Sequence, residues 1–238
     1  MTERLFLDAP RQTETTARVL AAGAEGVVLD RTVFYARSGG QAGDRGVLRW
    51  AGGEVAVAEA TKGAGEKILH LLAPGSAPPA VGTEVTASID WTYRHRLMRM
   101  HTTLHLLCSL LPGAGVTGGS VGADRSRLDL DLPAPPAKEV LEEGLNALIA
   151  ADHPVRAEWV EESVLDTNPD LVRTLSVKPP RGTGRLRLVR IGAGAVPIDL
   201  QPCGGTHVAA TGEIGRVVVQ KIESKGRQNR RVIVALAE

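Results

Sequence analysis

Short β-type runs, each ended by glycine, proline or aspartate, divide the chain between Arg4 and Asp90. Several of them alternate apolar and polar residues, which is typical of strands with one buried face. Such strands, closely spaced and separated by turn signals, are typical of a small barrel. The runs are RLFL, ARVLAA, GVVLD, GVLRW, EVAVAEA, KILHLL and EVTASID. This part of the chain is therefore predicted to form a β-barrel.

The pattern changes at Asp90, a favourable N-cap for the long run WTYRHRLMRMHTTLHLLCSLL. The run stops before Pro112, so it predicts a single helix. Apolar residues recur in it at helical spacing and predict one face that packs into a core: Leu97, Met100, Leu104, Leu107 and Leu111.

A second helix is predicted over residues 137–151, and the strand-like runs PVRAEWV, RLRLVRI, RVVVQKIE and RRVIVAL follow it. Helices that precede strands without strict alternation indicate an α+β fold rather than a doubly wound sheet. We therefore expect two domains, a small β-barrel over residues 1–90 and an α/β domain over residues 91–238.

Composition narrows the classes of function. A formal net charge of +1 gives no overall basic excess, although a local basic patch remains compatible with it. Aromatic residues make up only 3%, which argues against a binder that stacks many bases. The two cysteines, Cys108 and Cys203, lie far apart and fit free thiols in a reducing compartment. With no apolar signal segment and no run long enough to cross a membrane, a cytoplasmic protein is expected.

His101 and His105 lie four residues apart on the first predicted helix. Residues at this spacing share a helix face, so both imidazoles can reach one ion. The pair is not the zincin motif, because Thr102 rather than glutamate follows the first histidine. Taken alone, the pair fits ordinary surface or core histidines equally well.

Cys203 and His207 form a second pair in the segment CGGTH. Thiolate and imidazole are ligands that zinc prefers, and the paired glycines allow a tight turn around an ion. Together the two pairs predict one zinc site. Four protein ligands are typical of a structural site, whereas catalytic zinc keeps a position open for water, so both roles stay open. Cys108 shares the side of His105 but belongs to the apolar stripe, and is predicted to be a core residue.

Three further features can be ordinary structural elements or parts of a functional site. The glycine-rich segment 38–46 lacks the ending of a P-loop, and its pattern alone predicts a plain barrel turn. Segment 116–132 reads as a turn that feeds a strand, with Thr117 and Ser120 as turn residues. Basic residues are either solvated faces or local contacts to RNA phosphates: Arg94, Arg96, Arg99, Lys221, Lys225, Arg227, Arg230 and Arg231.

Five segments, in chain order, resemble the editing domain of alanyl-tRNA synthetase and especially its freestanding AlaX relatives. They are FYARSGGQAGDRG, RMHTTLHLL, GGSVGADRSRLDLDL, PCGGTHV and KIESKGRQNRRV, and they extend over residues 34–232. The resemblance implies the medium-length class, with a translation-factor-like barrel and a zinc-bearing domain shared with threonyl- and alanyl-tRNA synthetases. Leu104 departs from the threonine or glutamine of many relatives, which leaves side-chain preference open.

This resemblance implies a zinc-dependent deacylase that hydrolyses mischarged tRNA, most commonly Ser-tRNA(Ala), at its acceptor end. An alanine pocket rejects an added hydroxyl poorly, so a second site has to remove the error. The implied zinc ligands, which also act in catalysis, are His101, His105, Cys203 and His207. The implied substrate contacts are Thr117, which would recognise the hydroxyl, together with Ser120, Gly39, Gly40, Gln41 and Asp44. The implied tRNA contacts are Arg94, Arg99, Lys221, Lys225 and Arg227.

Other functions remain compatible with the same residues. Another β-hydroxy aminoacyl-tRNA, threonine-like or non-protein, is the alternative substrate. A non-catalytic tRNA-binding module with a structural zinc, and a zinc hydrolase of small molecules, are the alternatives of other classes.

Overall fold

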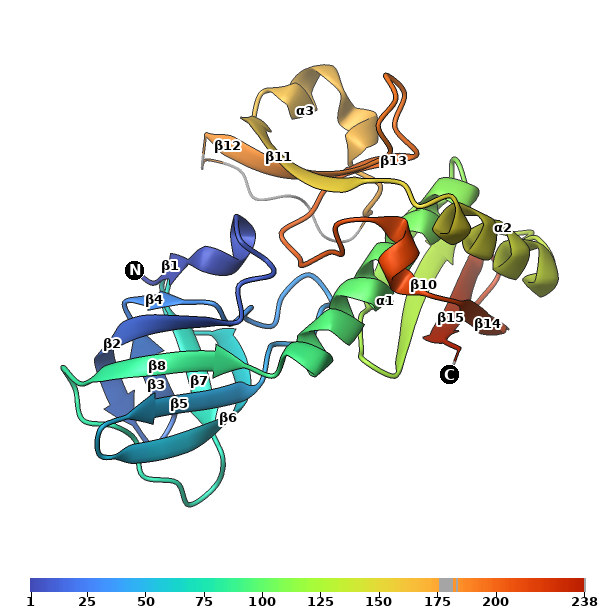
Figure 1. Ribbon diagram of the computed structural model, residues 1–238. Coiled ribbons are helices and arrows are strands. Elements are labelled where there is room, and N and C mark those ends of the chain that lie inside the picture. The colour runs from blue at the N-terminus through green and yellow to red at the C-terminus, as the bar shows by residue number, and fades with distance from the viewer. Residues whose placement is uncertain (176–181, 183, 238) are drawn as a thin grey trace. The chain divides into compact units, whose positions relative to one another are not determined.

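The computed structural model describes residues 1–175, 182 and 184–237, and the chain divides into two compact units, Met1–His95 and Arg96–Glu238 (Figure 1). The helix predicted after Asp90 is α1 (Trp91–Leu110), which begins in the first unit and continues into the second. Asp90 accepts the backbone N–H of Tyr93 at 3.0 Å, as expected of an N-cap.

The first unit contains the predicted barrel, closed in the order β2-β3-β7-β6-β5-β8 with every neighbouring pair antiparallel. Its strands are β2 (Glu14–Gly23), β3 (Gly26–Leu29), β5 (Gly46–Trp50), β6 (Gly53–Lys62), β7 (Ile68–Leu72) and β8 (Glu84–Ile89). Closure leaves the barrel without an edge strand, so it has no open edge at which another strand could pair.

The predicted strand RLFL is wrong for most of its length. Only β1 (Glu3–Arg4) is extended, and it pairs with β4 (Arg31–Thr32); Leu5–Leu7 form the 3₁₀ helix η1. The physical reason is that three successive apolar residues have no period of two. Turning the backbone buries Phe6 in the barrel core, with Leu5 and Leu7 packed beside it.

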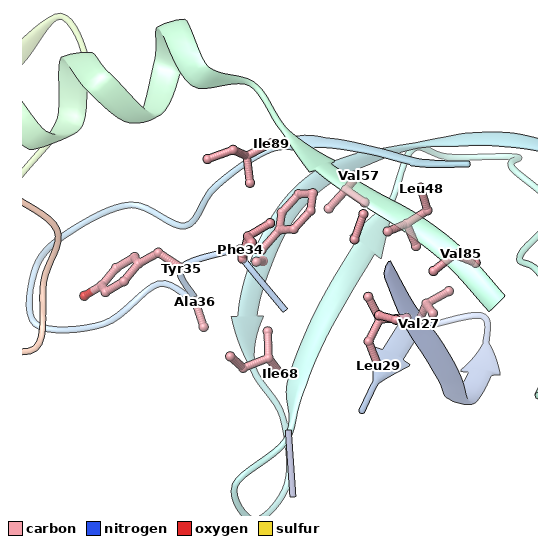
Figure 2. Close-up of a cluster of buried hydrophobic side chains, with 14 of the residues drawn as sticks. Val27, Leu29, Phe34, Tyr35, Ala36, Leu48, Val57, Ile68, Val85 and Ile89 are labelled. Atoms are coloured by element: carbon pink, nitrogen blue, oxygen red, sulfur yellow. The ribbon is translucent and has the colours of Figure 1, made fainter. Parts of the chain in front are cut away.

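One cluster of buried apolar side chains fills the barrel, and Figure 2 shows Phe34 among them. Phe34 is fully buried, and its ring meets the ring of His70 edge-on with centroids 5.1 Å apart. Large members of the cluster come from strands and from the connections between them: Leu29, Phe34, Tyr35, Leu48, Val57, Ile68 and Ile89.

His70 is a fully buried polar residue at the margin of this apolar cluster. Its Nδ1 lies 3.0 Å from the Val27 carbonyl, which can only accept, so Nδ1 carries the proton. Its Nε2 then accepts from the Thr32 hydroxyl at 2.8 Å. The neutral ring therefore satisfies both contacts. Burial lowers the pKa of His70 to about 4, although the Val27 carbonyl acts in the opposite direction.

Acid is expected to destabilise the barrel through His70. Below the ordinary pKa of 6.5 the unfolded chain binds a proton at His70, whereas the folded chain does so only near pH 4. The stability that His70 contributes is therefore complete above pH 6.5 and is lost between 6.5 and 4, by about 3 kcal/mol. Urea unfolding of the parent and of His70→Gln across this range measures the difference. Parallel pH profiles for the two proteins would contradict the assignment.

The second unit holds two antiparallel sheets and α2 (Lys138–Ala150), which confirms the predicted second helix. The four-stranded sheet has the order β14-β15-β10-β9, with β9 (Gly115–Ser120), β10 (Arg125–Asp131), β14 (Val217–Ser224) and β15 (Asn229–Leu236). The three-stranded sheet has the order β11-β12-β13, with β11 (Val155–Glu161), β12 (Arg185–Ile191) and β13 (Asp199–Pro202). The short helices are α3 (Val164–Thr167), η2 (Pro169–Leu171) and η3 (Thr211–Ile214). Among the helices in the described part of the chain, none has the length and apolarity needed to cross a membrane.

Side chains of α2 satisfy the outer backbone groups of β14, an edge strand. The Asn146 amide donates to the Val217 carbonyl at 2.9 Å and accepts the Val217 N–H at 3.0 Å. Glu142 accepts the N–H of Val219 at 2.9 Å. The helix therefore covers groups that would otherwise be a template for another strand.

Candidate metal centre

His101 and His105 lie on the part of α1 that belongs to the second unit, and both side chains are buried there. Both are buried, at 8% and 7% exposure, and their ring centroids lie 5.4 Å apart, as the spacing of four residues predicts. Residues 101–108 are all buried. The helix is therefore enclosed on all sides here, and the predicted single apolar stripe was too narrow.

The loop that follows β13 brings Cys203 and His207 to the same place. Arg187 of β12, only 6% exposed, fixes this loop by donating to the carbonyls of Cys203 at 2.7 Å and Gly205 at 3.1 Å. The Gly205 N–H points back at the Cys203 sulfur, with N and Sγ 3.4 Å apart. The loop thus wraps around its own thiol, which is the turn that the two glycines predicted.

The four ligand atoms of His101, His105, Cys203 and His207 lie within 4.8 Å of one another. The Cys203 Sγ is 3.3 Å from His207 Nε2 and 3.6 Å from His101 Nε2. Nitrogen and sulfur ligands of a tetrahedral zinc ion lie about 3.3–3.6 Å apart, given metal–ligand distances of about 2.0–2.3 Å. The donor types and the two separations from the Cys203 sulfur fit such an ion, and the set as a whole, within 4.8 Å, could hold a metal ion.

Asp199 and Thr102 orient two of these histidines through their second ring nitrogens. His105 Nδ1 lies 2.7 Å from Asp199 Oδ2, and Gln201 donates to the other Asp199 oxygen at 2.7 Å. The Thr102 hydroxyl donates to the Met98 carbonyl and lies 3.2 Å from His207 Nδ1. Protons held on both Nδ1 atoms leave each Nε2 directed at the metal position.

No sequence pattern predicted the supporting roles of Thr102 and Asp199. Thr102 was noted only because glutamate is absent there, and Asp199 carried no motif. The signal available for Asp199 was its place four residues before Cys203, which becomes informative only when β13 leads into the ligand loop.

The electrostatics of the cluster favour the metal-binding protonation state at Cys203 and His207, and the protonated, non-binding state at His105. Burial opposes a charge on Cys203, yet the adjacent His101 and His207 hold the pKa of its thiol well below the ordinary value. Burial and the neighbouring His101 lower the pKa of His207 to about 3. Burial also disfavours a charged His105, but hydrogen bonds to Asp199 and Cys203 raise its pKa to about 10. Thiolate and neutral imidazole are the forms that ligate a metal, so protons and a metal ion compete for this site.

Cys108 lies outside the four-residue cluster, as a core residue would. It is 4% exposed, and burial, together with the charge of Asp199, raises the pKa of its thiol to about 12. A thiol that stays protonated is a poor metal ligand and a poor nucleophile.

Thr117 and Ser120 are strand residues, so their interpretation as turn residues is wrong. Both belong to β9, and the chain reverses afterwards, at residues 121–124. Pairing with β10 outweighs the turn tendency of the intervening glycines, and the β9–β10 register shifts beside Thr117. The Asn229 amide donates to the Thr117 hydroxyl at 2.6 Å. Thr117 is therefore held in place from β15.

The glycine-rich segment is a tight turn, as its pattern predicted. Gly39 and Gly40 have φ of 55° and 82°, a conformation that glycine adopts without strain, and both are exposed. The backbones of Ser38 and Gln41 close the turn with hydrogen bonds of 3.2 and 2.9 Å. The side chain of Gln41 is fully buried.

Asp44 and Arg94 form a buried ion pair within the first unit. Their side chains are 1% and 0% exposed, and their implied roles as substrate and tRNA contacts stay predictions. Arg94 also donates to the carbonyls of Val33 at 2.7 Å and Pro10 at 2.8 Å, and Asp44 accepts the N–H of Tyr35 at 2.6 Å. The pair ties three segments of the barrel to the start of α1.

The other basic residues remain predictions as tRNA contacts. Arg99 is half-buried and donates to the Ile214 carbonyl at 2.6 Å. Lys221 and Lys225 are exposed and pair with Glu223 at 2.9 and 3.3 Å, and Arg227 is exposed in the connection between β14 and β15.

Comparison with known proteins matches both units. The family model "tRNA synthetases class II (A)" matches residues 2–93, and "Threonyl and Alanyl tRNA synthetase second additional domain" matches residues 186–233. The chain is 35% identical to an alanine–tRNA ligase of Pyrobaculum arsenaticum over 93% of its own length, but it spans only 25% of that ligase.

Shorter relatives match from end to end. The alanyl-tRNA editing protein AlaX-M of Methanosarcina mazei is 35% identical over 100% of this chain and 98% of its own length. The AlaX-M protein of Saccharolobus solfataricus is 32% identical over 98% of each chain. The chain thus belongs to the AlaX-M family of alanyl-tRNA editing proteins.

Proposed function

We propose that this protein is a zinc-dependent deacylase that hydrolyses the ester of mischarged aminoacyl-tRNA in trans, with Ser-tRNA(Ala) as its principal substrate. The observation that carries the proposal is the buried cluster of three imidazoles and one thiolate, oriented by Asp199 and Thr102. It occurs in a chain whose relatives are named for alanyl-tRNA editing.

When bound, zinc would polarise the ester carbonyl, lower the pKa of an attacking water or anchor the amino group of the substrate. The residues of the chain prepare the site for that chemistry. Asp199 keeps the proton of His105 on Nδ1 and Thr102 does the same for His207, so these imidazoles cannot rotate away. Arg187 holds the Cys203 loop against β12, which keeps the thiolate in position. A pre-set site loses little energy to reorganisation during the reaction.

We infer that the acceptor end of tRNA is held through phosphate contacts at Arg99, Lys221, Lys225 and Arg227. The negative charge of Glu223, which pairs with Lys221 and Lys225, reduces the local positive field. The affinity for tRNA should therefore depend only moderately on salt concentration. Free thiols and a tRNA substrate both fit the cytoplasm. Gly39 and Gly40 remain proposed substrate contacts, offered by an exposed turn.

A panel of radiolabelled aminoacyl-tRNAs tests this proposal. The expected result is rapid release of serine from Ser-tRNA(Ala), with Ala-tRNA(Ala) largely spared. Release of only a threonine-like amino acid would keep the mechanism and change the substrate. Salt-sensitive tRNA binding without release would favour the non-catalytic module. Absence of both would favour a hydrolase of small molecules.

Thr117→Val is expected to reduce hydrolysis of Ser-tRNA(Ala) about tenfold, because it keeps the shape of the side chain and removes the hydroxyl. Loss of one hydrogen bond to the substrate costs roughly 0.5–1.5 kcal/mol, and the upper end of this range corresponds to about tenfold in rate. Single-turnover deacylation, with zinc content measured in parallel, provides the readout. Thr117→Ser retains the hydroxyl and is the matched control. A parental rate for Thr117→Val would leave Thr117 with only a structural role.

A further inference from the structure

The three-stranded sheet has two faces of different character. Side chains alternate along a strand, and directly paired residues share a face. One face carries Val160, Leu186 and Leu188, which pack with α3 and η2 (Figure 1). On the opposite face lie four residues from the three strands: Trp159, Arg187, Gln201 and Asp199. We call this opposite face the metal-side face, because Asp199 binds His105 and Arg187 binds the Cys203 carbonyl.

A single cross-strand row on the metal-side face connects the metal centre to the edge of the sheet. Trp159 of β11 lies directly opposite Arg187 of β12. The Cys203 N–H donates to the Arg187 carbonyl at 3.1 Å, which continues the row to the ligand loop. Neighbouring strands are about 4.8 Å apart, so the backbone of Trp159 lies about 10 Å from that of Cys203.

Trp159 ends this row on β11, an edge strand, and is 39% exposed. Tryptophan is highly buried on average, so this degree of exposure is unusual. The guanidinium of Arg185, itself exposed, lies 5.6 Å from the centroid of the Trp159 ring. An indole with an adjacent guanidinium is a combination on which a nucleic-acid base stacks and beside which a phosphate binds.

We infer that Trp159, with Arg185, is a stacking platform for the 3′-terminal base of tRNA when the ester of that nucleotide lies at the metal centre. This inference rests on the proposed function. The platform needs only one aromatic residue, Trp159, for one base, so it is compatible with an aromatic content of 3%. A hydrolase of this kind must hold the terminal nucleotide firmly, because the amino acid alone offers few contacts. The platform would therefore bind the nucleotide and leave the hydrolytic step unchanged.

Deacylation kinetics provide the first test. Trp159→Ala is expected to raise KM for aminoacyl-tRNA about tenfold, within the range for the loss of one base–aromatic stack, with kcat and zinc content near parental values. Trp159→Phe keeps an aromatic face and should restore KM. Val196→Ala, at an 87% exposed apolar residue of the same unit, is the surface control. An unchanged KM for Trp159→Ala would overturn the inference.

Tryptophan fluorescence tests the platform without any turnover. A short single-stranded RNA with the 3′ sequence of tRNA should quench the parent, and Trp159→Phe should bind it equally well in a shift assay without that quenching. If quenching persists in Trp159→Phe, it comes from Trp50 or Trp91 and the platform is rejected. If the parent deacylates no aminoacyl-tRNA but Trp159 is still quenched, the proposed function fails while the nucleotide site stands.

Discussion

Cys203→Ala is expected to lose bound metal and deacylase activity together, whereas Cys108→Ala keeps both. Cys203 supplies the only sulfur within the four-residue cluster, and its thiolate is already favoured by the adjacent imidazoles. Loss of a residue that hydrogen-bonds to a metal ligand reduces metal affinity about 10–100-fold. Loss of the ligand Cys203 itself should therefore reduce metal affinity more than about 100-fold. Elemental analysis and competition with a chelator measure this effect, and the parent should carry about one zinc per chain.

Two controls make the cysteine experiment specific. Cys108→Ala removes a thiol that is buried and held in its protonated form, so its zinc content should match that of the parent. Asp199→Asn keeps the size of the side chain but weakens the hydrogen bond to His105, and an intermediate affinity is expected. The ligand assignment would be wrong if Cys108→Ala alone removed the metal.

Removing one partner of the buried ion pair is expected to destabilise the barrel by about 3–5 kcal/mol. Asp44→Asn leaves the guanidinium of Arg94 uncompensated at a site with 0% exposure. A buried unpaired charge is among the costliest defects a mutation can create. Urea unfolding followed by circular dichroism measures the change.

The exposed pair Arg49–Glu54 offers a matched control, because its side chains are 54% and 68% exposed. Glu54→Gln should change stability by less than about 1 kcal/mol. The double variant Asp44→Leu/Arg94→Met should recover part of the loss, since it removes both charges together. Equal effects of Asp44→Asn and Glu54→Gln would mean that the buried pair contributes no more than a surface pair.

Local spacing predicted the barrel and the four side chains whose ligand atoms the structure brings within 4.8 Å of one another. His101 and His105 share a helix face whatever the rest of the fold does, and Cys203 and His207 are close in any tight turn. Several strands of the barrel alternate, as β8 does with its pattern of buried and less buried residues. Leu5–Leu7, where three apolar residues run together, form a 3₁₀ helix instead.

Long-range packing determined what sequence reasoning missed. The sequence does not reveal that Asp44 and Arg94 pair inside the first unit, because a charge in the sequence carries no information about burial. Their ion pair joins positions 50 residues apart. The support of His105 by Asp199 spans 94 residues. Pairings of this kind depend on how strands and helices pack against one another. A single sequence considered by itself does not reveal that packing.

The metal centre joins α1 to the loop after β13, with His101 and Cys203 separated by 102 positions in the chain. A bound ion therefore acts as a removable cross-link that closes a long loop. In the chain-entropy treatment, a permanent cross-link of this length restricts the unfolded state by about 4–5 kcal/mol. A metal that binds only to the folded chain likewise couples folding to metal binding, so the folded fraction depends on the concentration of free metal. The availability of zinc would then set how much of this protein survives proteolysis as well as how much of it is active.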